Sequence, residues 1–399
     1  MRKVTVLIGL LCIVSVSCPA EQFRFQYREG EKYRILSQVK EDVFINSTYS
    51  HTAEILNKIA ISVTKTKDER GWLEATFITS ERSAGGGSVY EWGEEYHSEF
   101  WRGPFGKYDI AAKFFMPVVR NVPTFPDRDI QVGETWVAEG HEVHDFRKNF
   151  NVPDPFSFPI QVNYQYLGKT KRGNREYDRI AINYSVFYRS SRKYPGLGLY
   201  PVRLSGISRQ ELLWDNKAGR PFSYSEEFDF IFTLSSGAEV EYVGEAEAEV
   251  IEAENLNKKL EAENIKEKLD KEGYGDTEVR EDDEGVTISI ENIQFLPDSA
   301  VLLNSEKKKL SAIADILKDY PNRDLLITGH TALAGTEAGR QLLSEQRARA
   351  VADFLLSQGV KEEQEMVIRG MAAREPVADN STEQGRRRNR RVEITILEN

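Results

Sequence analysis

Five stretches near the C-terminus decide the fold of that end of the chain. They read I293-Q-F-L-P-D-S-A300, G329-H-T-A-L-A-G335, L343-S-E-Q-R-A-R-A350, P376-V-A-D-N380 and G385-R-R-R-N-R-R-V-E-I394. Polar and glycine-rich stretches of this kind end or begin regular elements, so the apolar pattern between them shows which elements they connect.

The segments around these stretches alternate between strand and helix patterns. Apolar residues at every second position predict strands at 286–290, 325–329, 366–368 and 392–396, and helical spacing predicts helices over 305–319 and 337–357. In the last strand, Glu393 and Thr395 are expected to point outward. The pattern predicts a compact α/β sandwich in which two long helices cover one face of a small sheet.

The length and composition of the chain are those of a multidomain globular protein. Its 399 residues exceed one ordinary core, and 40% hydrophobic with 11% aromatic residues are enough for burial. The formal net charge of −11 argues against a nucleic-acid partner, which needs a broad cationic surface.

The N-terminus predicts export across a membrane. Arg2 and Lys3 precede a mostly apolar run at 4–16, which has the length of a secretory signal and is too short to span a bilayer as a helix. Cleavage after Ala20 makes residues 1–20 a signal peptide, whereas cleavage before Cys18 would lipidate that cysteine. Both cysteines, Cys12 and Cys18, lie in this leader. We therefore expect a mature chain without disulfides and without a transmembrane helix.

Residues 21–244 predict an antiparallel all-β body. Apolar and aromatic residues recur at every second position, as at Phe23, Phe25 and Tyr27, with turn residues between the runs. We expect one or two barrel or sandwich modules. Prolines between 117 and 126 mark the best internal boundary, which gives a first module at 21–116 and a second at 117–244.

Residues 245–275 differ in composition from that body. They are rich in Glu, Ala, Lys and Leu, with Leu256, Leu260, Ile265 and Leu269 near helical spacing. This pattern predicts a charged connector helix that leads into a C-terminal domain at 276–399.

Taken together, the five stretches resemble the OmpA-like C-terminal domain, a wall-binding module also found in peptidoglycan-associated lipoprotein and in flagellar stator proteins. The motifs that carry the resemblance are Phe295 with Asp298-Ser-Ala300; Gly329-His-Thr331 with Gly335; Leu343-Ser344 with Arg347-Ala348; Gly370; Pro376-Val-Ala with Asn380; and Gly385-Arg386 with Asn389-Arg-Arg-Val-Glu393. The resemblance covers residues 276–399. It implies an α+β multidomain envelope protein in the periplasm or associated with the outer membrane.

The resemblance also implies a site for the peptidoglycan stem peptide, at its diaminopimelate residue. In such domains an arginine, here Arg347, holds the ligand's carboxylate, and an aspartate after Gly-His-Thr pairs with its ammonium group. This chain has Ala332 in place of the aspartate and Arg340 in place of an asparagine that opens the second helix. Loss of the aspartate removes a contact worth about 1.5–3 kcal/mol.

Our hypothesis is that Arg347, Asn380 and Arg390 line the remaining pocket. The alternative for Asn380 and Arg390 is that they cap loops and pair with acidic surface residues. Three functions stay open. The first is anchoring to, or organisation of, peptidoglycan and the outer membrane, with binding altered at Ala332. The second is a periplasmic scaffold that contacts envelope proteins and has lost peptidoglycan binding. The third is a carrier of an apolar ligand through the β body.

Other chemistry has little support in the sequence. His141 and His144 are three positions apart in a strand-like context, which points their rings to opposite faces and disfavours a metal site. No catalytic triad, paired-acid motif or phosphate loop stands out. We therefore expect a non-catalytic protein with no catalytic residue, no metal and no cofactor.

Overall fold

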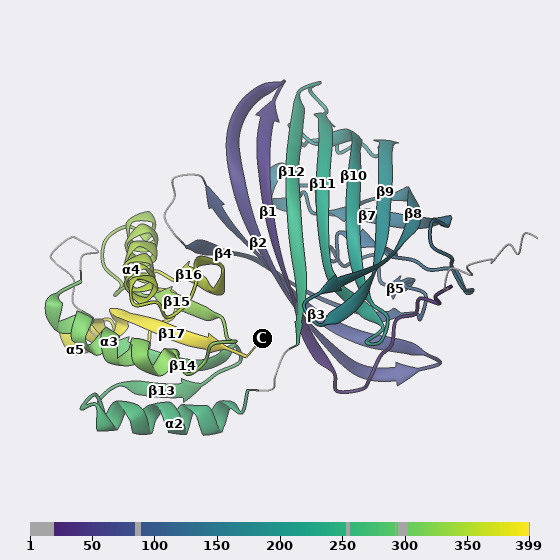
Figure 1. The fold of residues 1–399 in the computed structure, drawn as a ribbon. Helices are drawn as coiled ribbons and strands as arrows, with labels where there is room; N and C mark the ends of the chain where they lie inside the picture. Colours follow the sequence, from purple (N-terminus) through teal and green to yellow (C-terminus); the bar gives the residue numbers. More distant parts are fainter. Residues whose placement is uncertain (1–19, 84–88, 253–255, 292, 294–301, 399) are drawn as a thin grey trace, which may run out of the picture.

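The computed structural model describes residues 20–83, 89–252, 256–291, 293 and 302–398, which form a β body and a C-terminal α/β domain (Figure 1). Most of the expected signal peptide, with Cys18, lies outside the described residues, and so do Phe295, Asp298 and Ala300 of the first motif. No helix among the described residues is long and apolar enough to cross a membrane.

The β body is one antiparallel sheet. Its elements are β1 (Lys32–Ile45), β2 (Thr48–Lys67), β3 (Arg70–Ser83), β4 (Tyr90–Arg102), β5 (Tyr108–Ile110), β6 (Val119–Arg120), β7 (Thr135–His144), α1 (Arg147–Phe150), β8 (Phe156–Arg172), β9 (Arg175–Arg189), β10 (Pro201–Asp215), β11 (Arg220–Leu234) and β12 (Glu239–Glu252). The spatial order is β4–β3–β2–β1–β12–β11–β10–β9–β8–β7, with β5 on β4 and β6 on β7. The antiparallel β architecture is confirmed.

The strands of the two expected modules lie in this single sheet. β1 pairs with β12 from Tyr33–Glu252 to Ile45–Val240, so the first and last strands of the body are neighbours. The expected boundary at 116/117 lies in the connection between β5 and β6, and it does not interrupt the sheet.

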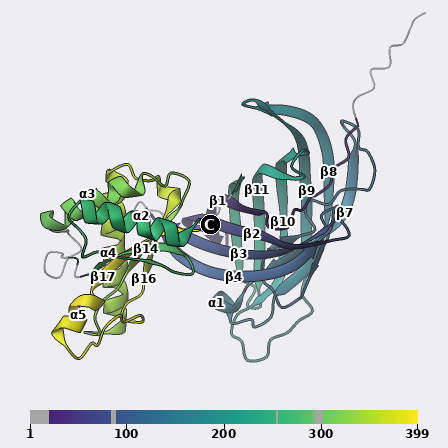
Figure 2. The same ribbon diagram turned by 90° about the horizontal axis from the view of Figure 1, so that it is seen from below.

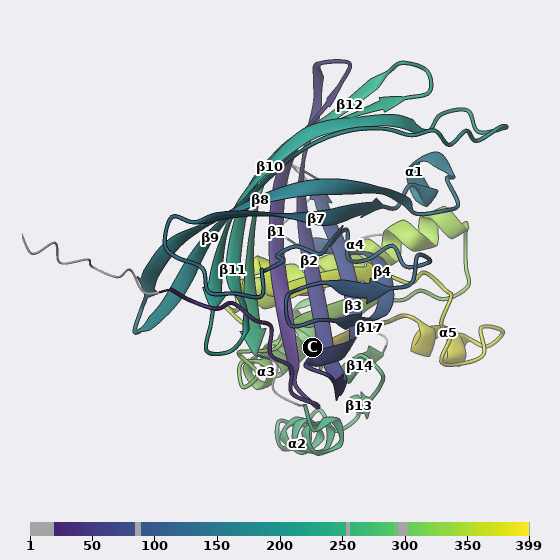
Figure 3. The ribbon, with the colours of Figure 1, turned by 90° about the vertical axis from the view of Figure 1, so that its right-hand side faces the viewer.

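The sheet curves strongly (Figures 2 and 3). Many of the aromatic side chains of the body belong to one buried core. Trp214, Tyr164 and Phe158 of this core are almost completely buried. The segment that begins with Phe23 and Phe25 lies within the same core, where the Phe25 ring meets the Trp214 ring edge-on at 4.8 Å between centroids. The alternating aromatics at the start of the body therefore fill the interior of the curved sheet.

The prediction of a helix over 245–275 is wrong for its first part. Residues up to Glu252 belong to β12, and helix α2 occupies only Lys258–Lys271. The reason is that residues 244–252 alternate small or apolar residues with Glu, a period-two pattern that a neighbouring strand can bury on one face. Ala246 and Ala248 are indeed buried, and β1 supplies the backbone partners.

The C-terminal domain is the predicted α/β sandwich. Its further elements are β13 (Glu278–Glu281), β14 (Gly285–Glu291), α3 (Asn304–Leu317), β15 (Leu325–Gly329), α4 (Glu337–Ser357), η1 (Glu363–Glu365), β16 (Met366–Gly370), α5 (Glu383–Asn389) and β17 (Arg391–Leu397). The sheet order is β13–β14–β17–β15–β16, in which β15 and β16 pair in parallel and the other described pairs are antiparallel. Helices α2, α3 and α4 contribute Ile265, Leu317 and Val351 to its core.

The expectation that Glu393 and Thr395 point into solvent is wrong, because both are buried. The hairpin between β13 and β14 supplies part of the cover over this sheet face. Its Arg280 contacts Glu393 at 3.0 Å, and Asp282 accepts a hydrogen bond from Thr287, which in turn contacts the Thr395 hydroxyl at 2.7 Å.

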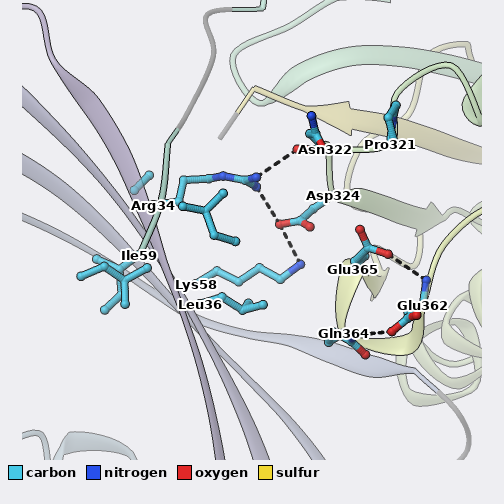
Figure 4. Close-up of a pocket in the computed structure, with 13 residues that line it drawn as sticks. Arg34, Leu36, Lys58, Ile59, Pro321, Asn322, Asp324, Glu362, Gln364 and Glu365 are labelled. Carbon is cyan, nitrogen blue, oxygen red and sulfur yellow. Dashed lines mark hydrogen bonds and ion pairs between the residues drawn. The ribbon is translucent and has the colours of Figure 1, made fainter. Parts of the chain in front are cut away.

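The two parts of the molecule share a strand pairing and a cluster of charges. Strand β16 pairs in parallel with the start of β4, so the strand pairing runs from one domain into the other. Beside this pairing, Asp324 lies 3.1 Å from the Arg34 guanidinium and 3.2 Å from the Lys58 amine, next to a cleft of about 400 Å³ (Figure 4). Burial lowers the pKa of Lys58, although the charge of Asp324 opposes that shift.

Candidate functional site

The candidate site is built from the loop after β15, the first half of α4, the loop after β16 and helix α5. Two glycines allow the strand ends to approach α4 closely. A Cβ on Gly329 would lie 2.0 Å from the Ser344 carbonyl oxygen, and one on Gly370 would lie 2.8 Å from the Ser344 hydroxyl. The Gly-His-Thr motif and the Leu-Ser motif are therefore adjacent because neither strand end carries a side chain there.

Asn380 holds the loop that contains Ala332. Its Oδ1 accepts hydrogen bonds from the Leu333 backbone N–H and from Asn389 Nδ2, both at 3.0 Å. Asn389 in turn accepts hydrogen bonds from the backbone N–H groups of Val377 and Ala378 at 2.8 and 3.0 Å. These contacts join three of the sequence motifs, and they make Asn380 a positioning residue for the loop that carries Ala332.

Arg347 and Arg390 place two positive charges in the same region. Arg347 projects from α4 and is partly buried. Burial lowers its pKa, and the nearby charge of Arg390 lowers it further. Arg390 also donates to Glu383 at 2.9 Å, which neutralises part of the local charge. A partly buried guanidinium near a second positive charge favours a bound anion.

Ala332 and Arg340 both precede these arginines along the chain. Ala332 is 5% exposed and supplies no charge. Arg340 lies in the first turn of α4, where its Nη1 donates to the Gly335 carbonyl at 2.6 Å. The Arg340 side chain therefore holds the loop that leads into α4, and position 332 carries no charged group.

His330, next to this loop, belongs to a buried ion cluster. It is 1% exposed, and its Nε2 lies 3.4 Å from Glu393, which also accepts from Arg391 at 2.8 Å. Burial lowers the pKa of His330. Burial would raise the pKa of Glu393, but the contacts with His330 and Arg391 outweigh it and hold that pKa far below its usual range. These contacts fit a structural role for His330 at the end of β15.

Glu383 is a residue of the site that the sequence motifs did not single out. It opens α5 behind the N-cap Thr382, whose hydroxyl accepts from the Gly385 N–H at 3.0 Å. Its carboxylate contacts Arg386 as well as Arg390. The sequence does contain a signal for Glu383. It is an acidic residue in the first turn of a helix, where the helix dipole favours a negative charge, and three arginines follow it in the same helix.

The histidine pair of the β body lies away from this site, on β7. His144 contacts Glu142 at 2.8 Å and stacks on Phe146 and Phe158. Within the described parts of the chain, no three His, Cys, Asp or Glu side chains are grouped so that they could hold a metal ion.

Comparisons with known proteins agree with the motifs. Residues 294–390 match the model of the OmpA family. The probable lipoprotein YiaD of Escherichia coli (strain K12) is 35% identical over 124 residues, which is 31% of this chain and 56% of that protein. The peptidoglycan-binding protein ArfA of Mycobacterium tuberculosis (strain ATCC 25618 / H37Rv) is 38% identical over 104 residues, which is 26% of this chain and 32% of that protein. The chain thus spans about half of the first relative's length and about a third of the second's.

Two solved structures are also similar to part of this chain. An outer membrane protein from Borrelia burgdorferi B31 is 36% identical, with a TM-score of 0.25, over 30% of this chain and 96% of that chain. The cell wall anchor of the T6SS from Pseudomonas aeruginosa is 29% identical, with a TM-score of 0.30, over 33% of this chain and 96% of that chain. The assignment rests on the sequence matches, and it confirms the resemblance. Residues 294–390 of this chain are a domain of the OmpA family.

Proposed function

We propose that the C-terminal domain attaches this protein to peptidoglycan by holding a carboxylate of the stem peptide at Arg347. The observation that supports the proposal is that the partly buried Arg347 lies close enough to Arg390 for the charge of Arg390 to lower the Arg347 pKa. A planar guanidinium binds a carboxylate through two parallel hydrogen bonds, and partial burial strengthens such contacts. The protein is then a non-catalytic anchor or organiser in the periplasm or at the outer membrane.

In this proposal Asn380 and Arg390 support the site in different ways. Asn380 fixes the loop that carries Ala332, through the Leu333 N–H. Arg390 adds positive charge, and its ion pair with Glu383 keeps its side chain in place. Ala332 makes the site selective for the anionic group of the ligand, since it offers nothing to the ammonium group.

Sedimentation with purified sacculi tests the proposal. The wild-type chain should co-sediment, and Arg347→Ala should reduce the bound fraction by about tenfold or more, as expected for a lost charge-assisted contact. Arg387→Ala is the matched control, because Arg387 lies in α5 with a side chain that is 63% exposed. If Arg347→Ala binds like the wild type, Arg347 does not hold the ligand. If none of the three proteins binds, the domain is a scaffold without wall binding.

A further inference from the structure

The β body contains a cavity that wall attachment does not use. It has a volume of about 300 Å³, at the lower end of the range of small-molecule sites. Most of its lining is apolar and comes from both halves of the sheet and from the segment between β5 and β7. Representative side chains are Ile35, Ile59, Phe77, Val119, Leu212 and Val250. Such a cavity fits a single alkyl chain.

One charged side chain in the cavity wall has no acidic partner. Arg102, at the end of β4, is 8% exposed. Its guanidinium carbon lies 3.7 Å from the centre of the Phe25 ring and 4.6 Å from that of Tyr108. Arg102 Nη2 donates one long hydrogen bond, of 3.4 Å, to the Val122 carbonyl, and Arg102 Nε has no hydrogen-bond partner among the described residues. No carboxylate of the described residues forms an ion pair with Arg102.

The acid that lines the same cavity is already satisfied elsewhere. Glu226 of β11 accepts hydrogen bonds from the Ser208 hydroxyl at 2.6 Å and from Gln210 Nε2 at 3.1 Å. Burial raises the pKa of Glu226, so its negative charge is disfavoured there. The cavity therefore offers a positive group with unused hydrogen-bonding capacity and an acid that does not neutralise it.

A buried guanidinium without an anion costs several kcal/mol unless a ligand compensates its charge. We propose that the cavity binds a fatty-acid-like ligand, whose alkyl chain fills the apolar lining and whose carboxylate pairs with Arg102. This site is independent of the C-terminal domain, so peptidoglycan binding and ligand binding can succeed or fail separately.

Calorimetric titration tests this proposal. The full chain, freed of bound lipid, is titrated with dodecanoate and, separately, with dodecanol. Wild type should bind dodecanoate saturably at one site and dodecanol about tenfold to 100-fold more weakly. Arg102→Gln should remove this preference. Arg70→Gln should keep it, because Arg70 also stacks on an aromatic ring, Trp101, but does not line the cavity.

A second variant keeps the proposal testable if Arg102→Gln does not fold. Leu212→Trp adds volume to the cavity wall, and it should abolish binding of both ligands by filling the space. Any one of three results would overturn the proposal. The wild type binds dodecanoate and dodecanol with equal affinity, Leu212→Trp binds dodecanoate fully, or the wild type binds neither ligand.

Discussion

At the scale of single residues, the proposed site has a cation at Arg347 and an uncharged residue at position 332. Arg347 keeps the group that would hold a carboxylate, whereas Ala332 removes the one that would pair with an ammonium. Neighbouring contacts show why the loop is still ordered without the aspartate: Asn380 bonds to the Leu333 N–H, and the Thr331 N–H donates to the Ala372 carbonyl at 2.7 Å. In the proposed site, different residues would therefore fix the loop and select the charge of the ligand.

Ala332→Asp should strengthen binding to sacculi. The new carboxylate would supply the missing partner for the ligand's ammonium group, and a charge-assisted contact is worth about tenfold to 150-fold in affinity. The dissociation constant is measured by sedimentation at increasing sacculus concentration. Ala332→Asn, which has a similar size and no charge, should stay near the wild-type value. A gain that is equal for both variants would show that the charge is not the cause.

Glu393→Gln should destabilise the C-terminal domain by roughly 3 kcal/mol, because it leaves the buried Arg391 guanidinium without its anion. Both side chains are less than one tenth exposed. Glu291→Gln removes the acid of a more exposed pair with Arg388 and should cost less than about 1 kcal/mol. Urea unfolding measures both changes, and similar losses for the two variants would contradict this account of the cluster.

At the scale of elements, the sequence predicted those with strong local patterns and missed those that depend on a partner. Helix α4 has the predicted bounds, and strands β14, β15, β16 and β17 lie where the apolar alternation placed them. Strand β12 was missed at residues 245–252 because Glu and Ala favour helices locally, while pairing with β1 decides the outcome. The burial of Glu393 depends on Arg280 in a hairpin that is distant in sequence, so no local pattern reveals it.

The Glu41 carboxyl, on strand β1, should make the stability of the β body depend on pH. Burial, with a smaller contribution from the charge of Glu81, raises the pKa of Glu41 to about 7. The folded state therefore holds this proton more tightly than the unfolded chain does, so stability is present below the unfolded pKa and falls as pH rises towards 7. Because one pKa unit corresponds to about 1.4 kcal/mol, the loss has an upper limit of roughly 3 kcal/mol.

The comparison of urea midpoints at pH 5 and pH 7.5 measures this dependence. Glu41→Gln should raise stability at pH 7.5 and flatten the change between the two values. Glu99→Gln, on the exposed part of β4, serves as the control and should keep the wild-type change. An unchanged pH dependence in Glu41→Gln would contradict the assignment to this carboxyl.

At the scale of the whole molecule, the candidate wall-binding domain and the cavity-containing β body are linked through β4 and β16. The backbone pairing of Tyr90 with Val367 is flanked by the Asp324 charge cluster and by an ion pair between Arg349 and Glu91 at 2.6 Å. Residues from both domains contribute to each of these contacts. The sequence predicted the β architecture and the C-terminal α/β fold but not the contact between them, because the pairing joins segments more than 250 positions apart whose local patterns are complete without it.

Asp324→Ala should loosen this link. The variant leaves the Lys58 amine, with a side chain that is 8% exposed, without its closest anion, which is expected to cost about 3 kcal/mol. Hydrogen exchange of the β16 amides should speed up relative to those of β14 in the same domain. Asp319→Ala removes an exposed ion pair with Lys268 and should leave the exchange unchanged. Equal exchange in all three proteins would show that Asp324 does not hold the domains together.

The most direct test of the central claim compares the affinity of the wild-type chain for two soluble stem peptides. One peptide has a free carboxylate on its diamino acid, and in the other peptide that carboxylate is amidated. If Arg347 holds that carboxylate, the free form should bind about tenfold to 150-fold more tightly than the amidated form, and Arg347→Lys should reduce the difference, because an ammonium lacks the planar fork. Equal affinities for the two peptides would contradict the account.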